Sequence, residues 1–228
     1  MAAQPYQFKS FKYNSHYRIL KILSQAGRPL RILDVGTADG YLGAILKAQG
    51  HWLAGVEREG ASAELAKSHY DEFHSADIEG FAFPDRDTFD YILFADVLEH
   101  LRDPEAVLKR ALPCLKERGE VIVSVPNIAN LAIRFSLLFG RFDYADRGIL
   151  DRTHLRFYTL SSLKRMLENC GCDLLDVMAT PIPVQLALPA TDHKLFAPLH
   201  ELHYLLARLR PSLLAYQFVV RAAPRAAQ

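Results

Sequence analysis

The stretch ILDVGTADGYLG, residues 32–43, decides the fold. It begins as an apolar run typical of a buried strand, turns at Gly36 and Gly40, and continues with helical spacing up to Gly50. The same alternation recurs along the chain, which predicts a parallel sheet covered by helices on both faces. The expected strands are 30–36, 52–59, 89–97 and 119–127, and the expected helices are 41–50, 61–70 and 103–116.

Composition narrows the class of protein. Half of the 228 residues are apolar, so the chain can bury a core as a single domain, 1–228. The net charge of +1, from 27 basic and 26 acidic residues, gives no reason to expect nucleic acid as a partner. No signal peptide or transmembrane run is expected, and the odd cysteine count favours a reduced, cytoplasmic location.

The turn after the first strand indicates the kind of ligand, because ligands of such sheets bind at the carboxyl ends of the strands. A dinucleotide fingerprint needs a small residue where this chain has Tyr41, and the lysine of a phosphate-binding Walker loop is missing. The carboxylates of Asp34 and Asp39 also disfavour a phosphate. They suit a ligand with an ammonium group, such as S-adenosylmethionine.

Acidic residues after the later strands complete the predicted cofactor site. Glu57 is placed to accept both ribose hydroxyls, Asp77 to accept from the adenine amino group with Ile78 stacked on the ring, and Asp96 to lie beside the point of methyl transfer. The predicted cofactor-binding residues are Asp34, Gly36, Thr37, Ala38, Gly40, Tyr41, Glu57, Arg58, Asp77, Ile78, Ala95, Asp96, Val97 and His100.

These motifs resemble those of the class I S-adenosylmethionine-dependent methyltransferases, in particular the bacterial type 11/type 23, ubiquinone-biosynthesis-like subgroup. LDVGTADG (33–40) matches the LDxGxGxG turn, GVERE (55–59) the acidic second motif, FDYILFADVLEHLRDPEAVL (89–108) the fourth motif, and GEVIVSVPN (119–127) the fifth strand. The resemblance covers roughly residues 10–180. The chain departs from the family at Thr37-Ala38, where Cys-Gly is common.

The resemblance implies a doubly wound α/β fold with a mostly parallel, seven-stranded Rossmann-like sheet. Its last strand, expected at 213–222, returns antiparallel after a helix around 196–209. We expect residues 1–30 to form an N-terminal helical cap and residues 127–158 to form an insertion that covers the substrate.

The segment DVLEH raises the question of a metal. Asp96, Glu99 and His100 have i, i+3, i+4 spacing, so on a helix they share one face that can bind a divalent ion. The ubiquinone O-methyltransferases that the chain resembles use such a metal, but other relatives with similar segments use none. We therefore expect no metal, with His100 bordering the substrate and the cofactor.

The segment LDRTH supplies the predicted base. His154 can remove a proton from an acceptor hydroxyl near neutral pH, with Asp151 holding its ring, so His154, Asp151 and His100 are the predicted catalytic residues. We expect a methyltransferase that acts on a hydroxyl of a small molecule or glycan and produces S-adenosylhomocysteine. Small-molecule N-methylation and a non-catalytic, cofactor-binding regulatory protein remain alternatives.

Overall fold

The computed structural model describes residues 12–84, 86–184, 191 and 193–225. Its centre is a seven-stranded sheet in the order β3-β2-β1-β4-β5-β7-β6, in which β7 runs antiparallel to both of its neighbours and the first five strands are parallel. The expected doubly wound, Rossmann-like fold is confirmed. The strands are β1 (Arg31–Val35), β2 (Trp52–Glu57), β3 (Glu72–Ser75), β4 (Phe89–Ala95), β5 (Leu115–Pro126), β6 (Cys172–Thr180) and β7 (Gln217–Pro224).

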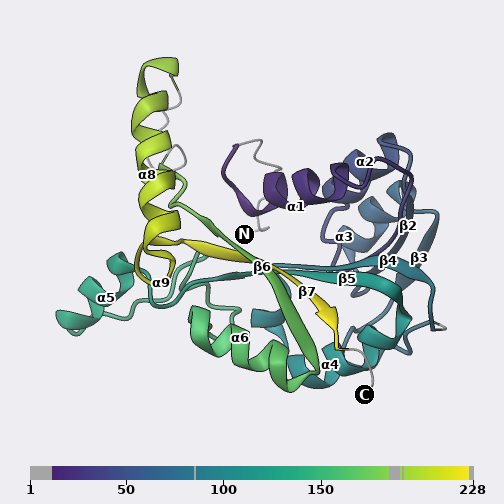
Figure 1. The fold of residues 1–228 in the computed structure, drawn as a ribbon. Coiled ribbons are helices and arrows are strands. Elements are labelled where there is room, and N and C mark those ends of the chain that lie inside the picture. Colours follow the sequence, from purple (N-terminus) through teal and green to yellow (C-terminus); the bar gives the residue numbers. More distant parts are fainter. Residues whose placement is uncertain (1–11, 85, 185–190, 192, 226–228) are drawn as a thin grey trace.

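Helices cover both faces of the sheet, as the alternation predicts (Figure 1). One layer consists of α1 (Ser15–Ser24), α2 (Tyr41–Ala48), α3 (Ala61–Ala66) and the short turn η1 (Lys67–His69). The other consists of α4 (Pro104–Ala111), η3 (Leu112–Cys114) and α6 (Leu160–Asn169), while η2 (Leu98–His100) follows β4. Each layer packs on its own cluster of buried apolar side chains, so the sheet has a core on either side.

Several expected element boundaries differ from those of the structure, and proline explains two of the differences. The helix expected at 103–116 is α-helical only to Ala111, because Pro113 cannot continue the hydrogen-bond pattern, and β5 then begins at Leu115. The last strand begins at Gln217 rather than at residue 213, because Pro211 starts the helical turn α9 (Pro211–Leu214). The helix expected around 196–209 is α8 (Ala197–Leu209), preceded by η5 (Lys194–Phe196).

Two helices project away from the sheet rather than covering it. Figure 1 shows α8 and α5 (Leu131–Leu138) as separate arms at the same end of the molecule. Within the described residues, no helix is both long and apolar enough to span a membrane. The side chains of Cys114, Cys170 and Cys172 are all buried.

Candidate active site

A cavity of about 450 Å³ lies at the carboxyl ends of β1 and β4, a volume typical of ligand pockets. It is lined by ten of the predicted site residues: Asp34, Gly36, Thr37, Ala38, Tyr41, Ala95, Asp96, His100, Asp151 and His154. The remaining predicted residues lie outside the lining of this cavity in the described part of the chain: Gly40, Glu57, Arg58, Asp77, Ile78 and Val97. The structure therefore brings together the first turn, the end of β4 and the predicted catalytic segment.

The turn between β1 and α2 is held in an unusual backbone conformation. Gly36, Ala38 and Gly40 have φ angles of +79°, +46° and +76°. Glycine adopts such angles readily, whereas a residue with a Cβ atom adopts them at a cost in free energy. A Cβ atom at Gly40 would lie 2.7 Å from the Cα atom of Ala66, so this glycine also allows α2 to approach α3. Ala38, where the family commonly has glycine, carries its methyl group in this left-handed conformation.

Glu57, at the end of the neighbouring strand β2, forms a hydrogen bond with the backbone of this turn. Its Oε2 accepts a 2.7 Å hydrogen bond from the Ala38 N–H, and its Oε1 accepts one of 2.9 Å from the Arg58 N–H. Burial raises the pKa of Glu57, although both backbone donors oppose the shift. In the next strand along, the Ala76 N–H donates to the Glu57 carbonyl, which places Asp77 and Ile78 just beyond the same edge of the sheet. Their contact with a cofactor stays a prediction.

Asp34 is a buried carboxyl with a partner that the sequence analysis missed. It is 2% exposed, and its Oδ2 accepts a 2.6 Å hydrogen bond from the hydroxyl of Tyr70, which follows η1. Burial raises the pKa of Asp34 to about 7, although the Tyr70 hydroxyl opposes this shift. The carboxyl is therefore partly protonated near neutral pH and is held in one orientation at the cavity wall.

Asp96 is fixed by the neighbouring strands and does not belong to a helix. Its φ is +59°, its Oδ1 accepts from the Ser124 hydroxyl at 2.5 Å, and its Oδ2 accepts from the Gln217 amide at 3.0 Å. The expectation that Asp96 shares a helical face with Glu99 and His100 is therefore wrong. The helical turn includes only Leu98–His100, and the Asp96 N–H before it donates to Ser124 of β5.

Glu99 has the most unusual environment in the cavity. Its side chain is 1% exposed, and neither carboxyl oxygen has a hydrogen-bond partner among the described residues. Burial, followed by the charge of Asp96, raises its pKa well above the usual range. Its carbonyl accepts from the N–H groups of Leu155 and Arg156, which ties the predicted catalytic segment to the end of β4.

The imidazoles of His100 and His154 meet edge to face, with ring centroids 4.8 Å apart. Nδ1 of His154 lies 3.1 Å from the carbonyl oxygen of Ile149, which favours the tautomer with the proton on Nδ1 and leaves Nε2 as the basic nitrogen. Nδ1 of His100 lies 3.2 Å from the Thr153 hydroxyl. Burial, then the charge of His100, lowers the pKa of His154, although the Ile149 carbonyl opposes the shift.

Asp151 does not hold the ring of His154 in the expected way. Its Oδ1 accepts from the backbone N–H and the hydroxyl of Thr153, at 2.8 and 2.7 Å. An Asp side chain readily bonds the backbone two residues ahead, and Asp151 forms this local bond with the Thr153 N–H. Partial burial would raise the pKa of Asp151, but the Thr153 bonds outweigh it and the pKa is lowered. Asp151 acts on His154 through its charge alone.

One cluster in the cavity has the side chains of a divalent-ion site. Glu99, His100 and His154 each place a potential ligand atom within 4.8 Å of the others, and Asp96 is not part of this set. The donor types, one oxygen and two nitrogens, suit a transition metal. However, burial favours the protonated form of Glu99, so an ion would have to displace that proton before it could bind. We therefore retain the expectation of metal-independent activity as a prediction.

Several residues that line the cavity were missed by the sequence analysis. His16 of α1 lies 3.3 Å from the Tyr41 hydroxyl, and burial lowers its pKa. Tyr216 precedes β7, and burial, then the Asp96 charge, raises its pKa to about 12. Arg147 comes from the loop after α5. No local pattern marks these residues, because only the fold carries them to the cavity.

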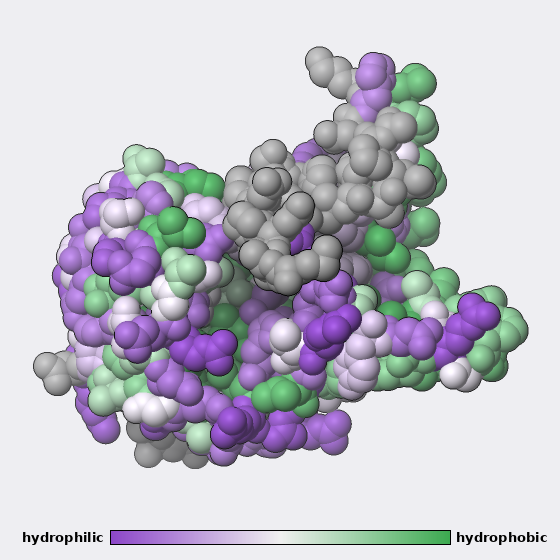
Figure 2. Space-filling view, turned by 180° about the vertical axis from the view of Figure 1, so that it is seen from behind, coloured by the Kyte–Doolittle hydropathy of each residue, from purple (hydrophilic) through white to green (hydrophobic). Residues whose placement is uncertain are grey.

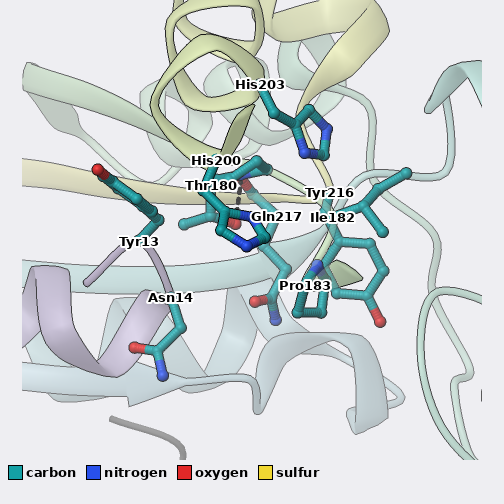
Figure 3. A pocket seen from close by; sticks show the side chains of 10 residues that line it. Tyr13, Asn14, Thr180, Ile182, Pro183, His200, His203, Tyr216 and Gln217 are labelled. Carbon is teal, nitrogen blue, oxygen red and sulfur yellow. Dashed lines mark hydrogen bonds between the residues drawn. The ribbon is translucent and has the colours of Figure 1, made fainter. Parts of the chain in front are cut away.

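A second cavity of about 40 Å³ adjoins the first and shares Asn14, Pro183, Tyr216 and Gln217 with it. Figure 3 shows the imidazoles of His200 and His203 on the side of this cavity that α8 provides. Nε2 of His200 lies 2.8 Å from the Thr191 carbonyl oxygen, so this histidine is engaged within the fold. This space extends the main cavity toward α8.

The sheet order, the glycine turn and the acidic residues at the strand ends define the class I S-adenosylmethionine-dependent methyltransferases. A family model described as a methyltransferase domain, of the type 23 group, matches residues 11–177. The chain belongs to this methyltransferase family.

Related proteins agree with the assignment. The chain is 27% identical over 154 residues to a ubiquinone biosynthesis O-methyltransferase of Coxiella burnetii, and the match covers 64% of each chain. The match thus spans less than two thirds of the length of this curated relative.

Solved structures share the fold at low identity. An S-adenosylmethionine-dependent methyltransferase from Archaeoglobus fulgidus superposes with a TM-score of 0.64, at 17% identity over 91% of both chains. The 1,6-didemethyltoxoflavin-N1-methyltransferase of Burkholderia thailandensis, solved with S-adenosylhomocysteine, superposes with a TM-score of 0.60 at 17% identity, covering 93% of this chain and 79% of the other.

Proposed function

We propose that this protein transfers a methyl group from S-adenosylmethionine to a hydroxyl of a small molecule or glycan. The observation that carries the proposal is the position of His154 in the cavity. Its Nδ1 faces the Ile149 carbonyl, and its Nε2 is left to act as a base among residues at the end of β4. A hydroxyl needs such a base, because its proton must leave as the new bond to carbon forms.

The two halves of the cavity suit two ligands. The turn of residues 34–41 offers backbone donors and the Asp34 carboxyl for the amino-acid part of the cofactor. Glu57 and Asp77, which lie outside the lining of the cavity, are the residues that we propose for the ribose and the adenine. When bound, S-adenosylmethionine supplies a methyl group that its sulfonium already activates. The other half, with His100, Asp151, His154 and Tyr216, is then left for the acceptor.

The electrostatics of the acceptor half suit proton removal. The lowered pKa of His154 keeps its ring neutral at pH 7, and therefore able to accept a proton. The carboxylates of Asp151 and Asp96 act in the opposite direction and stabilise the imidazolium that forms. Orientation supplies much of the remaining acceleration, since the acceptor oxygen must lie in line, about 3 Å from the methyl carbon.

The relative from Coxiella burnetii is named as an O-methyltransferase, which favours a hydroxyl over an amine. The toxoflavin enzyme is named as an N1-methyltransferase, but its identity of 17% supports the fold alone. N-methylation therefore stays the alternative.

A direct test uses S-adenosylmethionine with a labelled methyl group and two matched panels of acceptors, one of hydroxylated aromatic compounds and glycans and one of the corresponding amines. We expect label on oxygen only. Transfer to amines alone would contradict O-methylation. Tight binding of S-adenosylhomocysteine without transfer to either panel would favour a regulatory, non-catalytic protein.

A further inference from the structure

Helix α8 turns its apolar side away from the protein. Four leucines along it are exposed and follow one another at spacings of three and four: Leu199, Leu202, Leu206 and Leu209. Figure 2 shows the resulting hydrophobic surface along the outer edge of α8. The half-buried His200 and His203 lie on the side of the buried Ala207 and line the small cavity. A helix usually places apolar residues on the side that faces the protein, so two imidazoles on that side indicate a polar function.

The fold engages one of these imidazoles and leaves the other available. Nε2 of His200 lies 2.8 Å from the Thr191 carbonyl oxygen, so this nitrogen carries the proton. The side chain of His203 has no hydrogen bond to any residue that the structure describes. Figure 3 shows its ring projecting from α8 at the edge of the small cavity. A half-buried polar group of this kind is paired with water or with a ligand.

The lining of the small cavity can carry only positive charge near neutral pH. Its described residues include no Asp, Glu, Lys or Arg. Burial raises the pKa of the two phenols, Tyr13 and Tyr216, that of Tyr216 to about 12, so both stay neutral. Burial, then the charge of His200, lowers the pKa of His203, which is therefore neutral at pH 7. A nearby anion favours the imidazolium of His203, whereas a cation would meet no opposite charge on this lining.

The charges beside this lining favour an anion as well. Lys12, whose Nζ lies 5.1 Å from the centre of the Tyr13 ring, pairs with Glu201 at 2.6 Å, and both charged side chains are exposed. Arg18 of α1 is only 8% exposed, and its guanidinium carbon lies 5.7 Å from the centre of the same ring. Two positive charges thus lie near one negative charge where Tyr13 lines the cavity. Salt screens the buried guanidinium less than it screens an exposed charge.

The small cavity is a side chamber of the main one, with four lining residues in common: Asn14, Pro183, Tyr216 and Gln217. Its volume of about 40 Å³ leaves room for about three atoms the size of a water molecule, which is enough for a carboxylate group but not for a ring. The carboxylate of Asp96 lies in the main cavity, where Ser124 and Gln217 donate hydrogen bonds to it. A ligand can therefore place its reacting hydroxyl in the main cavity and a short acidic group in the small one.

We propose that the small cavity is a subsite for a carboxylate group of the methyl acceptor and that His203 is the residue that binds it. The acceptor is then a hydroxy acid, whose hydroxyl meets His154 in the main cavity while its carboxylate accepts a hydrogen bond from His203. This proposal rests on the proposed function for the hydroxyl and for the transfer of the methyl group. Binding of the acid does not require transfer, so the two can be tested separately.

The test is binding of two acids to the full chain saturated with S-adenosylhomocysteine: para-hydroxyphenylacetate and para-hydroxyphenylpropionate, each compared with its carboxamide. The amides keep the size and the hydroxyl of the acids but lack the negative charge. In titrations followed by NMR of the histidine ring protons, we expect at least one acid to bind about tenfold or more tightly than its amide, the factor expected of a charge-assisted hydrogen bond. The acid should also shift the His203 resonance and raise the pKa of this residue.

The affinity for the acid should rise as the pH falls from about 8 to about 6, because binding takes up a proton on His203. The affinity for the amide should change little. His203→Gln keeps a neutral hydrogen-bonding side chain that cannot take up this proton, so it should remove both the preference for the acid and its pH dependence. The matched control is His69→Gln in η1, outside the linings of both cavities, which should bind as the unchanged protein does.

Two results would overturn the proposal. One is an amide of each pair that binds the unchanged protein as tightly as the acid does. The other is a preference for the acid that persists in His203→Gln. If that variant does not fold, as judged by circular dichroism, the His203 resonance of the unchanged protein decides, and a resonance that the acids do not shift contradicts the proposal. Acid binding that depends on His203, without methyl transfer to the bound hydroxyl, would support the subsite and contradict the proposed methylation.

Discussion

The hydroxyl of Tyr70 donates a 2.6 Å hydrogen bond to the carboxyl of Asp34, at the point where β1 ends beside the cavity. Asp34 is fully buried, so its ionised form lacks the solvation it has in water, and one hydroxyl replaces only part of it. The same residue thus positions the turn that is predicted to bind the cofactor and makes the free energy of unfolding sensitive to pH.

We expect Asp34 to make the protein less stable as the pH rises from about 4 to about 7. The pKa of Asp34 is about 7 in the folded protein, against a usual value of 3.8, so in this interval the folded state holds a proton that the unfolded state has lost. The free energy of unfolding therefore falls with pH, by at most about 1.4 kcal/mol per unit from this group. Urea unfolding at several pH values, compared between the natural protein and Asp34→Asn, should show a smaller fall in the variant.

Gly40→Ala should cost about 2–4 kcal/mol of stability, because the φ of +76° disfavours any Cβ and the added carbon would lie 2.7 Å from the Ala66 Cα. Ala38→Gly is the matched change in the same turn. It relieves a left-handed alanine but adds freedom to the unfolded chain, so its effect should lie within about 1 kcal/mol. Thermal unfolding compares the two; equal effects would refute this account of the turn.

Glu57→Gln should weaken the binding of S-adenosylmethionine and S-adenosylhomocysteine by about 1.5–3 kcal/mol, the range for a lost charge-assisted hydrogen bond. Part of this loss comes from the turn itself, because Glu57 holds the Ala38 N–H. Titration calorimetry should give heat with both sulfur ligands and none with NAD. Heat with NAD, or none with either sulfur ligand in folded protein, would show that the turn has been misread.

Methyl transfer should survive chelation by EDTA. The pKa of Glu99 is raised well above the usual range, so the cluster with His100 and His154 carries a proton where a metal would need a carboxylate. The measurement is turnover before and after EDTA, followed by addition of magnesium, manganese or zinc. Activity that disappears with EDTA and returns with one of these ions would assign the cluster to a metal.

His154→Ala should lower kcat by about 10²–10⁴ while the affinity for S-adenosylhomocysteine changes by less than about tenfold. Since the pKa of His154 is lowered from 6.5, the acid limb of the pH profile of kcat/KM should lie below about pH 6.5. His100→Ala is the comparison, because His100 is also predicted to contact the cofactor. Near-normal turnover of the His154 variant, with an inactive His100 variant, would move the base to His100.

Asp151→Asn separates charge from geometry at the same site. The carboxylate bonds Thr153 and affects His154 only through its charge, so the variant should shift the acid limb of the profile to lower pH while keeping most of kcat. A loss of kcat as large as that of His154→Ala would instead indicate that Asp151 orients the ring during the reaction.

The sequence by itself determined the fold class and the position of the glycine turn at the end of β1. Short apolar runs, helical spacing and the turn from Gly36 to Gly40 act within about a dozen residues, and local conformational preference is sufficient to specify them. Asp34 and Glu57, near the ends of β1 and β2, and Asp77, just after β3, could also be placed at one edge of the sheet, because parallel strands bring their carboxyl ends together.

Only the tertiary structure decided how those residues are held and what faces them. Gln217 bonds Asp96 across 121 positions of sequence, and His16 of α1 reaches the hydroxyl of Tyr41, 25 positions later in the chain. The Asp151 carboxylate accepts from the Thr153 N–H, because a hydrogen bond to the nearby backbone competes with the predicted one to the His154 ring. Burial raises the pKa of Asp34 and of Glu99. No local sequence pattern predicts these shifts, because the solvation of a charge depends on everything packed around it.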